Sequence, residues 1–390
     1  MPRLLTRSFV VLLLAQSSFA FGFSSFFLLP KFVTRTLGGS PSQIGLVMAS
    51  FGATSIVFIP LVGDLIDRFG RRRFIVGGAA LMAAVSLGFL AVDRVGPLLY
   101  GLRMLQGIAF AMVFISASTL VADDAPPEHL GRAIGLFGVS ILSMHALAPA
   151  VAEEVAERVG WHAVFFMACA SSLVCLASTP LIEERRHAHA TADGPGILAV
   201  LRRPRSLRVG GVVGLTGAAF GAMMTYPQAF ALALGRSQVR GFFVAYAVAA
   251  VAVRLGFGGL ADRLGRRRVS LGSLVAYGSV VLAMGWLRPA LLEPLGFAFG
   301  AAHGLFYPAY NALAVEEASA SERGKVMALF NGAFNLGNSS ATLALGFVAE
   351  RFGYPSVFWI AGAGVFLSYA LLRASPDGRH VPAGATAASA

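Results

Sequence analysis

The sequence GDLIDRFGRRR at residues 63–73 returns as GGLADRLGRRR at residues 258–268, 195 positions later in a chain of 390 residues. Each copy follows an apolar run that is long enough to cross a bilayer, which takes about 20 helical residues. The same charged connection therefore joins two membrane helices in each half of the chain. Two similar halves in a membrane protein indicate a transporter, because alternating access needs two bundles that move against each other.

The composition supports a membrane protein. The chain is 56% hydrophobic and 13% charged, whereas soluble domains carry about 25% charged residues. Twelve apolar spans follow one another, near residues 8–30, 41–62, 74–92, 97–121, 132–153, 161–182, 208–232, 238–257, 269–287, 290–314, 325–348 and 354–372. The first span is too long for the apolar region of a signal peptide, so we expect it to be a retained helix. The sequence thus predicts an all-α membrane protein with twelve transmembrane helices in two pseudo-symmetric six-helix bundles.

A second repeat fixes the organisation of the halves. VAERVGW at residues 155–161 matches VAERFGY at residues 348–354, 193 positions later. Each half then holds an even number of helices, so the two halves run parallel. Residues 183–207 carry Gly, Pro and charge and read as a linker. We predict an N-terminal bundle at 1–182, a cytoplasmic linker at 183–207, a C-terminal bundle at 208–373 and a flexible cytoplasmic tail at 374–390.

The net charge of +12 is a topology signal. When the connections are numbered alternately, 21 of the 31 Lys and Arg residues fall on one side. The positive-inside rule places that side, both termini and both repeated loops in the cytoplasm of a cell (inner) membrane. The basic excess is explained by contact with the lipid bilayer, and no nucleic-acid partner is expected.

The residue types in the repeated loop indicate their structural roles. Gly63 allows close helix approach, and Gly70 and Gly265 permit a tight turn. Asp67 and Asp262 are acids at the membrane boundary, which need a partner. Each of the two acids is followed, one helical turn later, by an arginine that could be its partner. The other available partner is the positive end of a helix dipole, at the helix N-termini of the opposite half near Gly324 and Gly131. Alternatively, the arginines only anchor the loop in anionic headgroups.

The doubled loop resembles the signature of the major facilitator superfamily, G-x-L-x-D-R-x-G-R-R, and most resembles the drug and arabinose-efflux type proton antiporters. The resemblance implies that this network latches the halves together in the outward-facing state. It also implies a second acid at the end of the fourth and tenth spans. The latch candidates are Gly63, Asp67, Arg68, Gly70, Arg71, Asp123, Asp124, Asp262, Arg266, Glu316 and Glu317.

Arg103 lies inside the fourth span, where a charge is costly and is therefore a functional candidate. The spacing Arg103-x-x-Gln106-Gly107 resembles the motif of the drug–proton antiporters, in which the arginine handles proton or substrate. The alternative is that Arg103 snorkels to the outer surface. For Arg254, in the eighth span, we expect a structural role at the cytoplasmic surface or with Asp262.

Other polar residues in the spans leave alternatives open. His145 and His303 are candidates for proton coupling or substrate contact, or are buried neutral residues. Glu153 and Glu154 either titrate or are hydrated loop residues. Asn331, Asn335, Asn338 and Thr342 share one helix face, which either packs on other helices or meets water.

The family's fold implies that the first, fourth, seventh and tenth spans line the central path. Their Met, aromatic and few polar side chains suit an amphipathic or hydrophobic solute better than a sugar. The candidates for the substrate or proton path are Gln16, Phe23, Arg103, Gln106, Met112, His145, Met224, Tyr226, Gln228, His303, Tyr307, Tyr310, Asn311, Asn331, Asn335 and Asn338.

The sequence therefore predicts proton-coupled efflux of a small organic compound. The alternative is an uptake carrier or facilitator for a small organic anion, because Ala148 before Pro149 departs from the antiporters' Gly-Pro element. No metal spacing or catalytic constellation accompanies the spans, so we expect no enzyme, no metal and no cofactor. The proton gradient is the expected energy source, and the expected oligomeric state is a monomer.

Overall fold

The computed structural model describes residues 6–125, 129–182, 184, 203–257, 263–316 and 323–375, almost all of them helical. The N-terminal half contains the helices α1 (Arg7–Ser25), α2 (Leu29–Arg35), α3 (Pro41–Phe69), α4 (Arg71–Gly88), α5 (Pro97–Asp124), α6 (Leu130–Arg158) and α7 (Trp161–Ser178), with short 3₁₀ turns η1 (Phe26–Leu28), η2 (Phe89–Ala91) and η4 (Thr179–Leu181). The C-terminal half contains α9 (Pro204–Ala233), α10 (Arg240–Phe257), α12 (Arg266–Met284), η5 (Pro289–Leu291), α13 (Leu292–Glu316), α14 (Arg323–Phe352) and α15 (Tyr354–Arg373).

These helices confirm the twelve predicted spans. The segments α1, η1 and α2 together form the first span, and each later span coincides with one long helix. Eight of the described helical segments are long and apolar enough to cross a membrane, and the other four expected spans belong to the C-terminal half. Helix α9 begins at Pro204, so the last residues of the predicted linker 183–207 are helical.

Local signals explain where the helices begin and turn. Ser40 and Gln43 form a capping box at the start of α3. The turn into α4 passes through Gly70 at φ +90°, and the turn into α12 passes through Gly265 at φ +91°. This left-handed conformation favours glycine, so the predicted tight turns are confirmed in both copies of the repeat.

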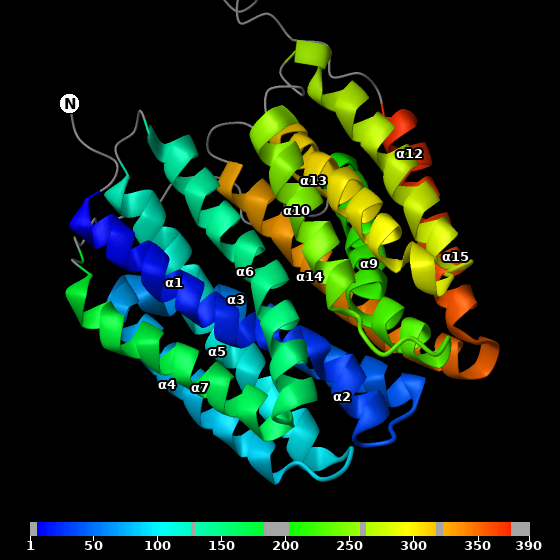
Figure 1. Cartoon of the computed structure of the whole chain (residues 1–390). Coiled ribbons are helices and arrows are strands. Elements are labelled where there is room, and N and C mark those ends of the chain that lie inside the picture. The colour runs from blue at the N-terminus through cyan, green and yellow to red at the C-terminus, as the bar shows by residue number, and fades with distance from the viewer. Residues whose placement is uncertain are drawn as a thin grey trace, which may run out of the picture.

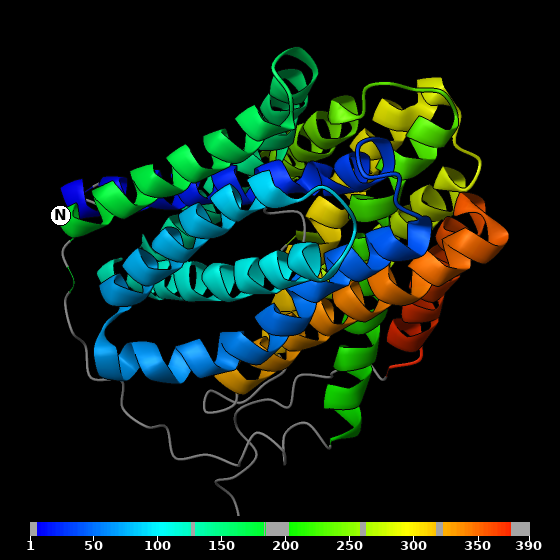
Figure 2. The same ribbon diagram turned by 90° about the horizontal axis from the view of Figure 1, so that it is seen from below.

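The helices form two six-span bundles that lie side by side (Figure 1). In the N-terminal bundle α1 packs on α6 and α7, while α4 and α5 pack on each other. The bundles meet along α3 with α14 and along α6 with α10 (Figure 2). Because α3 corresponds to α10 and α6 to α14 in the repeat, these two contacts are equivalents of each other.

The two ends of this interface differ in sequence. We call the end that carries Gly70 and Gly265 the Arg71 end, because α4 begins there at Arg71. We call the opposite end, where α2 lies, the Lys31 end.

Candidate functional site: the interface between the two halves

A buried ion pair lies at the Lys31 end. Lys31 of α2 is 8% exposed, and its ammonium group contacts the carboxylate of Glu153 on α6, which is 0% exposed. The Lys31 Nζ also lies 3.0 Å from Glu157 Oε1. It donates to the Ser237 carbonyl oxygen at 2.8 Å, across the interface. The hydrated alternative for Glu153 is therefore wrong.

Glu153 reaches the other half as well. Its Oε1 accepts a hydrogen bond from the Val239 amide at 2.9 Å, and its Oε2 accepts one from the Arg240 amide at 2.6 Å. These amides lie at the start of α10, where a carboxylate is stabilised by the free N–H groups and the helix dipole. These contacts join the halves at this end, and we call them the Lys31 network. Its members are Lys31, Glu153, Glu157, Ser237, Val239 and Arg240.

Glycines show that the interface is tight at the Lys31 end. A Cβ atom at Gly45 on α3 would lie 2.7 Å from the Thr342 carbonyl oxygen and 3.2 Å from the Gly346 Cα on α14. A Cβ atom at Gly52 would lie 1.7 Å from Ser339 Oγ. The backbones of α3 and α14 therefore touch here, an approach that only a residue without a side chain allows.

The same four helices are open at the Arg71 end. A Cβ atom added at Gly63 on α3, Gly135 on α6, Gly256 on α10 or Gly332 on α14 would meet nothing within 4 Å. The close approach predicted for Gly63 is thus absent in this conformation, because the halves have moved apart at that end. Four hydrogen bonds between the halves lie at the Lys31 end, donated by Lys31, the Ser42 amide, Gln228 and the Val239 amide.

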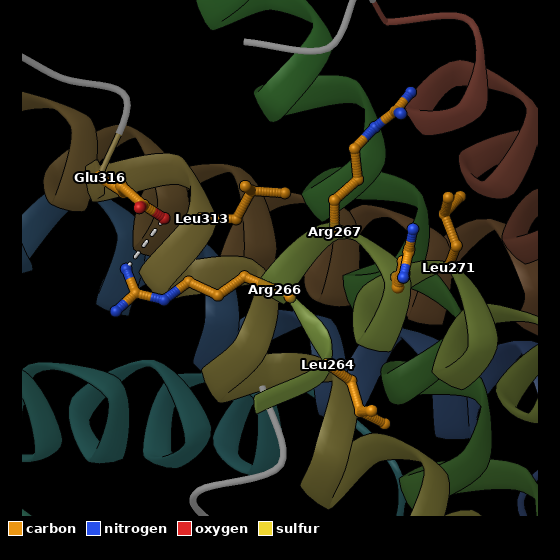
Figure 3. Close-up of a pocket in the computed structure, with 8 residues that line it drawn as sticks. Leu264, Arg266, Arg267, Leu271, Leu313 and Glu316 are labelled. Atoms are coloured by element: carbon orange, nitrogen blue, oxygen red, sulfur yellow. Dashed lines mark hydrogen bonds and ion pairs between the residues drawn. The ribbon is translucent and has the colours of Figure 1, made fainter. Parts of the chain in front are cut away.

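Each half holds its own acid–arginine pair at the Arg71 end. Arg71 Nε lies 3.2 Å from Asp123 Oδ2, with both side chains buried. Arg266 Nη1 lies 3.1 Å from Glu316 Oε2 (Figure 3). These pairs join the start of α4 to the end of α5, and the start of α12 to the end of α13. The sequence placed acids at these two helix ends, and the structure brings them to the arginines.

The remaining latch candidates are either exposed, bonded elsewhere or outside the described residues. Arg68 is exposed, and Asp124 lies beside Asp123 with partners of its own. Asp262, Glu317 and the side chain of Asp67 lie outside the described part of the structure. Glu184, which sequence reasoning placed in the linker, accepts hydrogen bonds from the Arg71 amide at 2.6 Å and the Arg72 amide at 3.4 Å. Its carboxylate therefore caps α4.

The second copy of the loop borders a recess of about 410 Å³. Its walls are basic and aliphatic, with Arg266, Arg267 and Arg268 beside Leu264, Leu271 and Leu313 (Figure 3). Arg267 is used within the fold, since it donates to the carbonyl oxygens of Leu372, Arg373 and Ser375 at the end of α15. The recess lies inside the C-terminal half, away from the interface between the halves.

Arg103 is buried inside the N-terminal half and does not snorkel. It is 3% exposed, and its Nη1 donates to Gln106 Oε1 at 2.7 Å. Its Nε donates to the Val47 carbonyl oxygen on α3 at 3.3 Å, and its guanidinium carbon lies 5.0 Å from the centre of the Phe51 ring. Gln106 is itself 0% exposed. The Arg103–Gln106 pair thus joins α5 to α3, the helix that contacts the other half.

We expect Arg103→Ala to reduce transport by about tenfold or more while the protein still inserts. Removal of the guanidinium leaves the buried Gln106 oxygen unpaired, at a cost of about 1–3 kcal/mol, and loosens α5 from α3. Transport into vesicles, normalised to inserted protein, measures the effect. Met104→Ala is the matched control, because Met104 on the same helix is 43% exposed. Undiminished transport by Arg103→Ala would show that Arg103 is only a packing residue.

His303 lies inside an aromatic cluster in the C-terminal half. Its ring centre lies 4.8 Å from that of Phe220, 5.8 Å from that of Phe299 and 5.7 Å from that of Tyr307. Tyr246 Oη lies 3.0 Å from His303 Nδ1, whereas His303 Nε2 is buried and has no hydrogen-bond partner among the described residues.

His145 and Arg254 face each other across the α6–α10 contact. Arg254 interacts electrostatically with His145, and a Cβ atom at Gly138 on α6 would lie 3.7 Å from Arg254 Nη1. The centre of the His145 ring lies 4.9 Å from that of Phe27, with the two rings tilted by 59°. The side chain of Arg254 therefore lies between the halves and not at the surface, while the expected alternative, a contact with Asp262, falls outside the described residues.

The asparagine stripe on α14 divides into two parts. At the Arg71 end, Asn331 is exposed and accepts a hydrogen bond from Tyr307 Oη at 3.0 Å. Further along, Asn335 donates to the Asn331 carbonyl oxygen at 2.9 Å. Asn338 and Thr342 pack against α9, where a Cβ at Gly221 would lie 2.4 Å from Asn338 Oδ1. The end of the stripe at Asn331 is therefore exposed, while the end at Asn338 and Thr342 packs on another helix.

The first and seventh spans meet near the Lys31 end. Gln228 on α9 donates to the Phe27 carbonyl oxygen at 2.8 Å, across the interface. Tyr226 donates to the Thr342 carbonyl oxygen beside Gly45. Met224 is half-buried against the same core.

The remaining path candidates are placed as follows. Gln16 is 3% exposed on α1, and Phe23 packs its ring at 5.2 Å on Phe51. Tyr310 is buried and stacks on Phe306, while Asn311 is half-buried beside it. Met112 points away from the interface, because its Cε would lie 2.9 Å from a Cβ at Gly77 on α4. Its prediction as a path residue is wrong, since α5 is rotated to pack that side chain inside its own half.

Comparison with known proteins gives one consistent family. Residues 10–237 and 209–389 match the profile of the Major Facilitator Superfamily. The chain is 27% identical over 321 residues to a Tetracenomycin C resistance and export protein of Streptomyces glaucescens, covering 82% of this chain and 54% of that protein. It is 26% identical over 336 residues to the Multidrug resistance protein MdtG of Enterobacter lignolyticus, covering 81% of this chain and 78% of that protein.

Solved structures show the same fold. The nucleoside transporter NupG superposes with a TM-score of 0.78 at 16% identity, covering 95% of this chain and 100% of that one. The human organic anion transporter MFSD10 (TETRAN) superposes with a TM-score of 0.69 at 17% identity, also covering 95% of this chain and 100% of that one. At these identities the likeness concerns the fold alone.

Proposed function

Since the chain belongs to the major facilitator superfamily, and is a multi-pass membrane transporter rather than an enzyme, we propose that it exports a small organic or amphipathic compound in exchange for protons. The main support for this proposal is that the interface between the halves is closed at one end and open at the other. Its Lys31 end is closed by the Lys31 network and by backbone contact at Gly45, while its Arg71 end is open at Gly63 and Gly332.

Alternating access follows from that unevenness. The bundles 1–182 and 208–373 rock as rigid bodies about the two equivalent helix contacts. Closing the Arg71 end requires opening the Lys31 end, which breaks the bonds from Glu153 to the start of α10. The Arg71–Asp123 and Arg266–Glu316 pairs then hold the loops in place for contact with the opposite half, together with Asp67 and Asp262 as the latch.

The direction and the energy source rest on similarity and on the titratable groups. Two relatives that match most of this chain are named for export and for multidrug resistance. We propose the proton gradient as the energy source, with His145 and His303 as proton carriers, because both lie inside membrane-spanning helices and histidine is the side chain that ordinarily titrates nearest to neutral pH. No organic cofactor is part of this mechanism.

We propose that the Arg71 end, both termini and the linker face the cytoplasm. The basic residues of the repeated loops cluster there, as the positive-inside rule requires. The structure then represents the state that is open to the cytoplasm and able to take up solute for export. We propose a monomer in the cell (inner) membrane, because one chain supplies both halves of the path.

Inside-out vesicles test the export proposal. With an imposed proton gradient and a fluorescent amphipathic dye, the protein should accumulate dye and release internal acid, as read by a pH-sensitive probe. A variant with Gln at both His145 and His303 should lose the acid release. Dye uptake that is unaffected when the proton gradient is collapsed would contradict proton coupling.

The second candidate is an uptake carrier or facilitator for a small organic anion. It is favoured by one observation: within the described residues, the acidic side chains lie at or near the ends of the helices, whereas the basic side chain of Arg254 lies against α6 between the halves. Equilibration of solute down its own gradient, without proton movement, would support this candidate over export.

A further inference from the structure

Within the described part of the chain, Arg254 is a cation without a counter-ion between the two halves. Its Nε is buried, and among the described residues it has no hydrogen-bond partner and its guanidinium forms no ion pair. The residue as a whole is half-buried, so part of its surface remains open. An unpaired arginine in a membrane span is costly, and such residues mark substrate or ion pathways.

The groups around Arg254 are hydrogen-bonding and aromatic. Its charge interacts with His145 on α6, with Tyr246 on its own helix and with His303 and Tyr307 on α13. These four side chains are neutral or cationic, so none of them supplies the negative charge that a guanidinium pairs with. Among the residues that the structure describes, none places an anionic side chain at this site.

A second polar atom at this site is also unsatisfied. His303 Nε2 is buried without a partner, and Nδ1 of the same ring is engaged by Tyr246 Oη at 3.0 Å. If the hydroxyl donates to Nδ1, Nε2 carries the proton and is a second free donor. Phe220, Phe299 and Phe334 surround the same ring with apolar surface, at centre distances of 4.8, 5.8 and 6.2 Å.

The site is accessible from one side. Gly135 on α6 and Gly256 on α10 lie towards the Arg71 end from Gly138 and Arg254, and both are open beyond 4 Å. At the other end, the Lys31 network and the Gln228–Phe27 bond close the path. A solute that enters from the Arg71 end therefore reaches Arg254 before it reaches the closed end.

We infer that Arg254 binds the anionic oxygens of the transported compound, and that this compound is an aromatic organic anion such as a carboxylate. The guanidinium donates to the anionic group in fork geometry, and the rings around His303 contact the apolar body. This inference rests on the proposed transport function and deepens it, because it assigns the substrate class and its anchor.

Equilibrium binding to the purified full-length protein tests the site. The probes are aromatic carboxylates, each matched with its neutral carboxamide: benzoate and benzamide, phenylacetate and phenylacetamide, naphthoate and naphthamide. The wild type should bind the acids about tenfold or more tightly than the amides at neutral pH, as expected for a charge-assisted bond. Arg254→Gln should bind acid and amide equally, while Arg254→Lys should keep part of the preference.

Arg288→Gln is the matched control, because it removes one arginine charge from an exposed position at the Lys31 end. It should retain the full preference for acids. Equal binding of acids and amides by the wild type, the absence of binding by every acid, or an acid preference that persists in Arg254→Gln would overturn the site. If Arg254→Gln fails to fold, the preference of the wild type for acids over amides and the reduced preference of Arg254→Lys still test whether Arg254 binds the anion.

The same panel separates the two proposals. Proton-driven export of neutral dyes without any acid preference would remove the anion site and leave the export function in place. Acid-selective binding that depends on Arg254, in a protein that shows no proton-driven export, would keep the site and remove the export function.

Discussion

Gly45→Leu is expected to abolish transport and to open the Lys31 end. In the closed state a Cβ at Gly45 would lie 2.7 Å from the Thr342 carbonyl oxygen and 3.2 Å from the Gly346 Cα, and backbone atoms cannot rotate away. Overpacking costs about 1–3 kcal/mol, and each 1.4 kcal/mol is about tenfold in the population of the closed state. A cysteine at Val239, which is 0% exposed, should then react with an impermeant thiol reagent.

Gly63→Leu on the same helix is the matched control. A side chain at Gly63 meets nothing within 4 Å in this state, so the Lys31 end should stay closed and Val239→Cys should stay unreactive. We expect transport to fall in this variant too, because the Arg71 end can no longer close. Equal reactivity in the two variants would contradict an interface that is tight at only one end. The native Cys169 and Cys175 are buried and can be replaced by Ala.

Lys31→Met is expected to produce the second large effect. The change leaves the carboxylate of Glu153, 0% exposed, with backbone amides as partners and no cation in its pocket. Loss of one partner of a buried pair costs about 3 kcal/mol, at the low end of the usual range because those amides remain. Thermal unfolding should begin at lower temperature, and the Lys31 end should open to the same thiol reagent.

Two further variants isolate the buried charge. Lys31→Met combined with Glu153→Gln removes both charges and should recover part of the stability. Arg158→Gln breaks a pair with Glu154 in which the arginine side chain is 77% exposed, so it should leave unfolding unchanged. If Lys31→Met behaved like Arg158→Gln, the Lys31 network would not hold the halves together.

The spans and the repeat could be predicted because the membrane restricts backbone structure so strongly. Backbone groups in lipid must bond within a helix, so an apolar run such as 97–121 reappears as the helix Pro97–Asp124. The turns were predictable for a similar reason. Gly70 and Gly265 occupy left-handed positions that other residues resist, and the repeat places both at matching sites.

The acid–arginine pairs were predictable only as far as the helix ends. The sequence placed Asp123 and Glu316 at the ends of the fourth and tenth spans, but it could not choose which of two neighbouring acids points to the arginine. That choice depends on helix rotation. The carboxylate of Asp123 reaches Arg71, with Oδ2 3.2 Å from Nε.

Long-range partners and helix rotation account for what the sequence missed. Lys31 and Glu153 are separated by 122 residues, and they meet because the first and fifth spans converge at the closed end. A helix that is apolar on all sides gives no hint of the face it turns inward, so Met112 was placed on the path and Arg254 away from it. One signal was available for the Lys31 network: a lysine directly after Pro30 at the end of an apolar run.

Two spin-label distances test the alternation of the two ends most directly. One label pair spans the halves at the Arg71 end, at Phe69 and Leu207, and the other spans them at the Lys31 end, at Val159 and Trp286, all exposed positions. In Gly45→Leu relative to the parent protein, we predict a longer distance at the Lys31 end together with a shorter one at the Arg71 end. Two distances that lengthen together, or that stay unchanged, would contradict two rigid halves that close at one end as they open at the other.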